Sequence, residues 1–173
     1  MRVVAGVARG RCLEAPDSAD TRPTSDRVRE AIFNSLASMD ALDDAKVLDL
    51  FAGSGALGIE ALSRYAAHCT FVERARPALD AIRTNLDVTG LSDRANVVVA
   101  DAMTFVTQGK GADFDLVLAD PPYDFRQWGE LLNGITTALV VAESNRSVTP
   151  SQGWEVLREK RYGKTWVTFL ERA

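Results

Sequence analysis

The chain has 173 residues, of which 46% are hydrophobic and 25% are charged. This is the composition of an ordinary soluble domain, and it excludes a disordered, collagen-like or coiled-coil protein. Its 20 Lys and Arg against 24 Asp and Glu give a net charge of −4, which argues weakly against a nucleic-acid partner. No apolar run approaches the length of a membrane span, and the two cysteines match no disulfide or metal motif. We therefore expect a cytoplasmic monomer with no membrane or metal partner.

The charge is not evenly spread along the chain. Residues 1–11 contain three arginines and no acid, and residues 158–173 contain five basic residues against two acids. The excess of acid therefore lies in the middle, and the two ends are basic.

Residues 1–44 are expected to form an N-terminal extension, followed by the main domain at 45–173. Within the extension, Arg2–Leu13 alternates weakly and contains two glycines, which predicts a twisted hairpin with a glycine turn. A turn-rich stretch follows, and Ser25 or Asp26 is a predicted N-cap. The helix after it has an apolar stripe formed by Val28, Ile32 and Leu36.

From Lys46 onward, short apolar strands alternate with helical stretches, which is typical of βαβ units and a parallel sheet. The predicted strands are Val47–Phe51, Thr70–Glu73, Asn96–Ala100, Asp115–Ala119 and Leu139–Glu143. The predicted helices are Ala56–Tyr65, Arg76–Val88, Ala102–Gln108 and Gln127–Leu139. Ser144–Gly153 is too short and polar for a regular crossover helix. Two alternating runs then predict an antiparallel hairpin at one edge, formed by Trp154–Lys160 and Thr165–Leu170. The expected fold is α/β and doubly wound.

The segment Val47–Glu60 predicts a strand, a glycine turn and a helix. Gly53, Gly55 and Gly58 fit the GxGxxG pattern, in which the backbone approaches a ligand closely. Asp49 would place a carboxylate beside that turn, where it repels a pyrophosphate and attracts a positively charged amino group. S-adenosylmethionine carries an ammonium and a sulfonium and no phosphate, so the pattern favours it as the cofactor.

Two further carboxylates follow predicted strands. Glu73 ends the second strand, where it can accept both hydroxyls of a ribose, and Asp101 follows the third, where it can accept from an adenine amino group. Three such carboxylates fit S-adenosylmethionine better than a nicotinamide dinucleotide. An NAD-dependent oxidoreductase that uses the same glycines remains the alternative from another class.

The tetrapeptide Asp120-Pro121-Pro122-Tyr123 directly follows the fourth predicted strand. The exocyclic nitrogen of a nucleobase is a poor nucleophile, because its lone pair is delocalised into the ring. Rigid oxygen acceptors that hold its hydrogens promote attack, and the Asp120 carboxylate and Pro121 carbonyl can serve as such acceptors. Tyr123 can stack on the base. These four residues are the predicted catalytic residues, and no covalent intermediate is expected because neither cysteine lies in a Pro-Cys motif.

The motifs Asp-Leu-Phe-Ala-Gly-Ser-Gly and Asp-Pro-Pro-Tyr resemble those of the class I amino-methyltransferases. Thr21–Asn34 resembles more particularly the RsmD-type enzymes, which methylate N2 of a guanine in bacterial 16S ribosomal RNA. The resemblance covers nearly the whole chain. It implies a Rossmann-like, mostly parallel seven-stranded sheet with an antiparallel terminal hairpin, preceded by an N-terminal β-hairpin and helix. An adenine-N6 methyltransferase of DNA or RNA stays open, because the same tetrapeptide serves those enzymes; a related Asn-Pro-Pro-Tyr group methylates a glutamine amide.

The resemblance also implies a role for individual residues. Cofactor binding is implied for Asp49, Phe51, Ala52, Gly53, Ser54, Gly55, Glu73, Arg74, Asp101, Ala102 and Asp120. The segment Arg22–Asn34 is expected to form a lid, and the basic hairpin at Val4–Arg11 is expected to contact RNA. The residues expected to contact the substrate RNA are Arg9, Arg11, Arg22, Arg27, Arg29, Arg161 and Lys164. The expected partner is 16S ribosomal RNA within a small-subunit particle.

These assignments change what the net charge means. Asp49, Glu73, Asp101 and Asp120 are four of the 24 acids, so setting them aside leaves 20 acidic against 20 basic residues. The acidity then describes the expected cofactor site, and the basic ends of the chain remain available to a polyanion.

Overall fold

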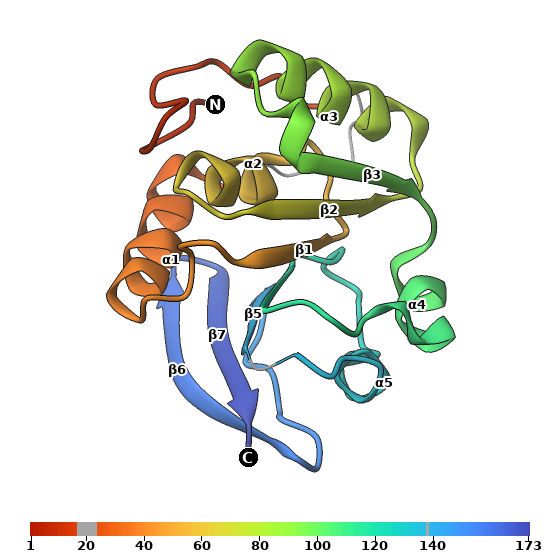
Figure 1. The fold of residues 1–173 in the computed structure, drawn as a ribbon. Coiled ribbons are helices and arrows are strands. Elements are labelled where there is room, and N and C mark those ends of the chain that lie inside the picture. The colour runs from red at the N-terminus through yellow and green to blue at the C-terminus, as the bar shows by residue number, and fades with distance from the viewer. Residues whose placement is uncertain (17–23, 138) are drawn as a thin grey trace.

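The computed structural model describes residues 1–16, 24–137 and 139–173. Across these residues seven strands form one sheet in the order β3-β2-β1-β4-β5-β7-β6, with helices on both faces (Figure 1). Five strands are parallel: β1 (Lys46–Leu50), β2 (His68–Glu73), β3 (Ala95–Val99), β4 (Leu116–Ala119) and β5 (Leu139–Ser144). The last two, β6 (Trp154–Tyr162) and β7 (Thr165–Arg172), are antiparallel to each other, and β7 is antiparallel to β5. The predicted doubly wound α/β sheet with a terminal hairpin is confirmed.

One helix precedes the first strand, and the others lie between the parallel strands, as expected. They are α1 (Asp26–Ser38), α2 (Ala56–Ser63), α3 (Arg76–Thr89), α4 (Ala102–Phe105) and α5 (Trp128–Asn133), with a 3₁₀ turn η1 (Ser92–Arg94) and a π turn η2 (Val106–Lys110). The helix predicted over Gln127–Leu139 is much shorter than expected. Gly134 ends it, and Ile135 then forms a parallel bridge with Gly111. The connection at 145–153 contains no helix, in agreement with its polar sequence.

Alternation along the strands builds a separate core on each face of the sheet. In β1, Val47 packs with α1, α2 and α3, whereas Leu48 packs with α4 and α5. In β4, Leu118 belongs to the first core and Val117 to the second. Side chains along a strand alternate between the two faces of the sheet. Polar residues an even number of positions from Val47 in β1 or from Leu118 in β4 therefore point toward the face covered by α1, α2 and α3.

The predicted N-terminal hairpin is present as a short antiparallel pairing, with a bridge between Arg2 and Cys12 and backbone hydrogen bonds from the Val3 amide to Arg11 and from the Gly10 amide to Val3. The amides of Val4 and Ala5 do not pair across the turn; they donate to the carboxylate of Glu60 in α2 at 2.9 and 3.0 Å. A buried carboxylate accepts more strongly than a carbonyl, so the segment bends onto α2, beside which it lies in Figure 1. Gly6 makes this approach possible, because its ideal Cβ would lie 1.8 Å from the carbonyl oxygen of Ser63.

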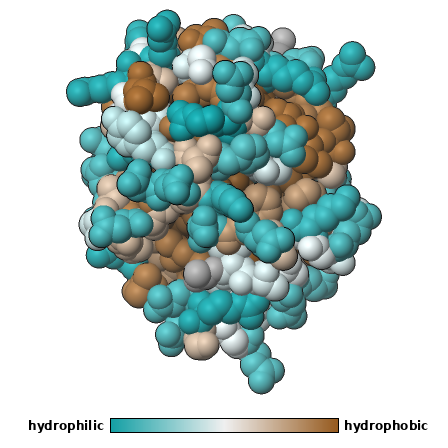
Figure 2. Space-filling model, viewed as in Figure 1, coloured by the Kyte–Doolittle hydropathy of each residue, from teal (hydrophilic) through white to brown (hydrophobic). Residues whose placement is uncertain are grey.

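The surface of one face is shown in Figure 2. It is mainly hydrophilic, and apolar residues gather on the side where β3 lies in Figure 1. Val99 of this edge strand is 64% exposed. No helix in the described part of the chain has the length and apolar character needed to cross a membrane.

Candidate active site at the carboxyl edge of the sheet

The registers of the central strands bring acidic residues into one row. Leu50 of β1 lies beside Ala119 of β4, which in turn lies beside Ala142 of β5. The next residue along each strand therefore shares a row at the carboxyl edge, where α/β sheets bind their ligands. Together with the matching residue of β2, this row holds Glu73, Phe51, Asp120 and Glu143.

The glycine turn after β1 is a left-handed backbone segment. Phe51, Gly53 and Gly55 have φ of 57°, 57° and 78°. An ideal Cβ on Gly53 would meet only the Phe51 carbonyl oxygen, at 4.0 Å, so the outer side of the turn is open to a ligand. Gly58 has the opposite surroundings, because its Cβ would lie 2.3 Å from the Phe71 ring. Gly53 thus permits close approach, whereas Gly58 permits close packing of α2 on β2.

Asp49 lies beneath this turn and is only 1% exposed. Its Oδ2 accepts from the amide of Gly58 at 2.9 Å and so caps α2, whose own N-cap residue Gly55 has no side chain. Burial raises the pKa of Asp49 well above its usual value, the Gly58 amide lowers it, and the nearby carboxyls of Asp120 and Glu73 raise it further. A cation bound at this edge would relieve that repulsion.

Glu73 and Asp101 lie on the other side of the turn. One oxygen of Glu73 accepts from the amide of Gly53 at 2.9 Å, which ties the glycine turn to the end of β2. Asp101 is the N-cap of α4 and accepts from the amide of Thr104 at 3.0 Å. The exposed Arg74 reaches across to Asp101, with 3.3 Å between Nη1 and Oδ2. The structure therefore brings together the residues expected to bind the nucleoside.

The loop Asp120–Tyr123 is held by aromatic packing. Phe51 and Phe125 pack edge to face with ring centroids 5.3 Å apart, and Phe125 packs in the same way on Trp128 at 5.1 Å. The Phe125 amide also donates to the carbonyl of Pro122 at 2.9 Å. The loop is thereby fixed beside the glycine turn, with the Tyr123 side chain 45% exposed.

Asp120 contacts Thr24, which in turn contacts Glu143, and neither Thr24 nor Glu143 was among the residues predicted for the site. The hydroxyl oxygen of Thr24, just before α1, lies 3.1 Å from Asp120 Oδ2 and 2.9 Å from Glu143 Oε2. Burial raises the pKa of Asp120 to about 7, against the lowering effect of the Thr24 hydrogen bond. Glu143 was detectable, since it ends a predicted strand as Glu73 does. Thr24 carried no comparable signal of its own.

A second missed residue is Arg126. Its guanidinium donates to the carbonyls of Tyr123 and Phe125 at 3.2 and 3.1 Å, and its side chain is exposed. A positive charge is therefore fixed directly beside the tetrapeptide.

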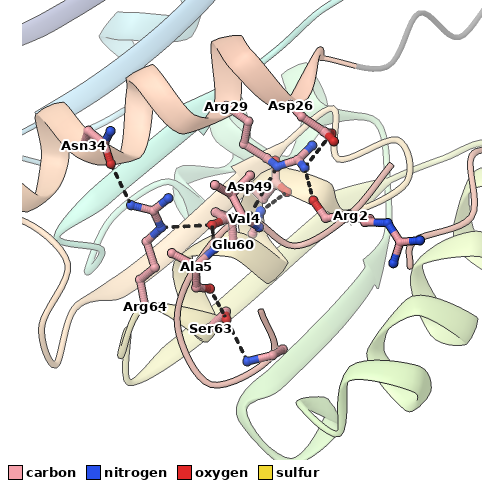
Figure 3. A network of polar contacts seen from close by, with 12 residues as sticks. Arg2, Val4, Ala5, Asp26, Arg29, Asn34, Asp49, Glu60, Ser63 and Arg64 are labelled. Atoms are coloured by element: carbon pink, nitrogen blue, oxygen red, sulfur yellow. Dashed lines mark hydrogen bonds and ion pairs between the residues drawn. The ribbon is translucent and has the colours of Figure 1, made fainter. Parts of the chain in front are cut away.

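The prediction that Arg29 contacts RNA is wrong. Its side chain is fully buried and points from α1 toward Glu60, with Nε 3.4 Å from Oε2 (Figure 3). It also pairs with Asp26 at 2.9 Å and donates to the backbone carbonyl of Arg2. The Glu60 carboxylate is fully buried, and Arg29 balances its charge together with Arg64. Its neighbour Arg27 is exposed.

The other predicted RNA contacts are spread over the surface. Arg9 and Arg11 are exposed in the N-terminal segment, whose Val7 amide donates to Ser63 at the end of α2 away from the glycine turn. Arg161 and Lys164 are exposed at the turn between β6 and β7. Trp166 pairs with Ser144 at the carboxyl end of β5, so this turn lies at the same edge as Asp120. Arg22 lies outside the described residues.

Known proteins resemble this chain over nearly its whole length. A family model described as Conserved hypothetical protein 95 matches residues 1–171. The chain is 41% identical to ribosomal RNA small subunit methyltransferase D of Escherichia coli strain K12, over 99% of this chain and 90% of that protein. It is 36% identical to YlbH of Bacillus subtilis strain 168, over 99% of both chains. A solved structure of yhhF from Escherichia coli superposes with a TM-score of 0.85 at 38% identity, covering 99% of this chain and 97% of that chain.

Proposed function

The chain belongs to the family described as Conserved hypothetical protein 95, and from this premise we propose that it methylates the exocyclic N2 of a guanine in 16S ribosomal RNA. It is a methyltransferase of this family, which removes the oxidoreductase alternative. The observation that carries the proposal is the position of Asp120 and Pro121. They directly follow β4 and lie beside the glycine turn of β1, whose outer side is open, and this position supports their proposed role as acceptors for the amine.

The proposed cofactor is S-adenosylmethionine, which supplies a methyl group on a positively charged sulfur. The residues present fit it, because the carboxyls of Asp120 and Glu73 both repel that of Asp49, and a cationic ligand would relieve this repulsion. The open side of Gly53 allows close approach of the ligand to the backbone. In this proposal Glu73 accepts the ribose hydroxyls and Asp101 accepts from the adenine amino group.

The proposed acceptors for the target amine are the Asp120 carboxylate and the Pro121 carbonyl. Both would take hydrogen bonds from the amine hydrogens and so orient the nitrogen lone pair for attack. Their rigidity matters because the acceptors must already be in place as positive charge develops on nitrogen. Packing of Phe51 on Phe125 supports that rigidity, and Tyr123 is exposed enough to stack on a base that has left its helix.

Basic residues at the same edge are the proposed phosphate contacts. Arg161 and Lys164 project from the β6–β7 turn, and Arg126 lies beside the tetrapeptide. Arg27 is exposed on α1. These few charges form a modest footprint for a polyanion, so we expect an assembled small-subunit particle to supply further contacts.

The test is methyl transfer from labelled S-adenosylmethionine to three substrates: naked 16S ribosomal RNA, small-subunit particles lacking the modification, and duplex DNA. Nucleoside mass spectrometry identifies the product. We expect N2-methylguanosine in the ribosomal RNA and none in DNA. Label recovered as N6-methyladenosine would refute the guanine target. Absence of transfer to every substrate, with calorimetry showing that the cofactor still binds, would refute the RNA substrate itself.

A further inference from the structure

A cavity of about 290 Å³ lies between α1 and the β6–β7 hairpin, which are neighbours in Figure 1. Ala31, Ile32 and Ser35 form its wall on α1, and residues of β6 and β7 form the opposite wall. The guanidinium of Arg158 in β6 reaches the helix, where it donates to the Ser35 hydroxyl oxygen at 3.1 Å. The cavity is therefore bordered by a positively charged side chain.

A β-bulge in β6 turns two basic residues toward this cavity. The pairing register shifts between Val156 and Arg158, so Leu157 is an extra residue in the strand. Arg158 pairs with Phe169 of β7, which packs in the core that α1 covers. Lys160 follows two residues later and lies on the same side. Without the extra residue, both side chains would point to the opposite face of the sheet.

The two basic residues have no acidic partner within the described part of the chain. Neither Arg158 nor Lys160 belongs to an ion pair there, and both side chains are exposed. Glu159 also borders the cavity, but its carboxylate is directed to the other side of the strand. There it accepts from the hydroxyls of Ser147 and Thr168 at 2.8 to 3.0 Å. The two positive charges are thus available to an anionic ligand.

We propose that this cavity binds the sugar-phosphate backbone of the substrate RNA, with Arg158 and Lys160 each contacting a phosphate. Residues two positions apart on a strand are separated by about 7 Å, which is close to the spacing of successive phosphates in an RNA strand. The Lys160 ammonium lies 5.2 Å from the centroid of the Tyr162 ring, which holds it at the wall of the cavity. Arg158 gives one N–H to Ser35, and its guanidinium has further donors for a phosphate.

The inference rests on the proposed function and extends it from the target base to the RNA strand beside it. The helix α1 begins two residues after Thr24, whose hydroxyl contacts Asp120. Arg27 in its first turn is exposed and lies one helical turn before Ala31, which lines the cavity. An RNA strand whose target base reaches Asp120 can therefore continue along α1, past Arg27 and into the cavity.

The first test removes both charges by combining Arg158→Gln with Lys160→Gln. Filter binding of labelled 16S ribosomal RNA, with S-adenosylhomocysteine present, should give a Kd about tenfold above that of the wild type. The slope of log Kd against log salt should decrease in magnitude by about 1 to 2. In methylation assays KM for RNA should rise with Kd, whereas kcat should fall by less than about twofold, because the cavity does not contact the reacting atoms.

The matched control combines Arg83→Gln with Lys110→Gln. These are also two exposed basic residues, but they lie on α3 and η2, so the net charge changes equally at a distance from the cavity. This variant should change Kd by less than about twofold. Calorimetry of S-adenosylhomocysteine binding checks that both double variants are folded.

A second test leaves every basic residue in place. Ala31→Glu introduces a carboxylate into the cavity, where it pairs with the two cations and repels phosphate, so Kd for RNA should rise at least about fivefold. Asn34→Glu adds the same charge to the same helix, at an exposed position that does not line the cavity. This control should change Kd by less than about twofold.

A double variant at Arg158 and Lys160 whose Kd and salt slope match those of its control would overturn the inference. Equal effects of Ala31→Glu and Asn34→Glu would do so as well. If wild-type protein methylates the RNA in that case, the proposed function stands without this path for the strand. If Kd changes as expected while wild-type protein methylates no RNA, the cavity binds RNA and the proposed function fails.

Discussion

Two acidic groups on one side of the sheet, the buried Glu60 and the half-buried Asp120, are balanced in opposite ways. Glu60 in α2 accepts from the backbone amides of Val4 and Ala5 and from the Arg64 side chain at 2.9 to 3.0 Å. The Arg29 guanidinium adds an ion pair at 3.4 Å. Each oxygen of this carboxylate is therefore matched by a donor, although its side chain is fully buried.

Within the part of the chain that the structure describes, Asp120 at the carboxyl edge has no such complement. The Thr24 hydroxyl is the donor that reaches it, Glu143 shares that donor, and Asp49 lies nearby as a further acid. We infer from this difference that the Glu60 cluster serves stability and that the edge cluster serves the proposed reaction. The Glu60 cluster fastens the N-terminal segment and α1 to α2. Among the described residues, the edge cluster gives Asp120 fewer donors than Glu60 has, and in the proposed function the target amine supplies further ones.

The largest expected effect comes from removing the edge carboxyl. Asp120→Ala should lower kcat by about a thousandfold or more, because an oriented acceptor for the developing positive charge is lost. Affinity for S-adenosylhomocysteine, measured by calorimetry, should stay within about threefold. Asp124→Ala removes an exposed acid four residues further along and should leave turnover near wild type. Unchanged turnover in Asp120→Ala would contradict the role assigned to this residue.

The second prediction tests the Glu60 cluster. Arg29→Ala removes the fully buried one of the two arginines that pair with the Glu60 carboxylate and should lower the free energy of unfolding by about 3 to 5 kcal/mol. Urea denaturation measures this change. Arg27→Ala, two residues away on the exposed face of α1, should change stability by less than about 0.5 kcal/mol. Equal effects of the two substitutions would contradict the contrast between them.

The third prediction concerns stability and pH. The pKa of Asp120 is raised to about 7 in the folded protein, against about 3.9 in an unfolded chain. The folded state therefore binds the proton more tightly, and wild-type stability should fall as pH rises from about 4 through 7. Asp120→Asn removes this penalty and should be about 2 kcal/mol more stable than wild type at about pH 8.5, with no gain near pH 4. Urea melts across this range provide the measurement, and a gain that does not vary with pH would argue against the raised pKa.

The smallest effect is expected at the β6–β7 turn. Replacing Arg161 and Lys164 with alanine should raise KM for ribosomal RNA about three- to tenfold and leave kcat within about twofold. The slope of log KM against log salt should decrease in magnitude by about 1 to 2. Lys110→Ala, an exposed charge on η2, is the control. An unchanged salt dependence in the double variant would remove this turn from the proposed RNA contact.

Much of the fold was predictable because its signals are local. The parallel strands appear as short apolar runs, and each observed strand begins and ends within two residues of its predicted position. The glycine turn was predictable for the same reason, since Gly53 and Gly58 serve the backbone of one continuous strand–turn–helix unit. The acids that follow the strands come together because parallel strands end at one edge.

The rest depended on partners that are distant in sequence. In the sequence, Arg29 cannot be distinguished from an exposed helix arginine, because its partner Glu60 belongs to α2. The alternation of the N-terminal segment predicts a hairpin, but it gives no sign that the amides of Val4 and Ala5 donate to Glu60, which lies 56 and 55 residues away. Thr24 meets Glu143 across 119 residues. A pattern within a short stretch of sequence cannot reveal such pairs, because the two residues meet only when the helices pack against the sheet.

The order of strands divides the edge into two halves with β1 between them. On one side β2 and β3 lead to Glu73 and Asp101, the proposed nucleoside contacts; on the other, β4 and β5 lead to Asp120 and Glu143. The two sets share no strand. Under the proposed function, substitutions on the β4–β5 side would act on the target amine while leaving the nucleoside contacts on the β2–β3 side in place. Such a division makes this architecture readily adaptable, both for divergence among natural methyltransferases and for deliberate redesign of the target.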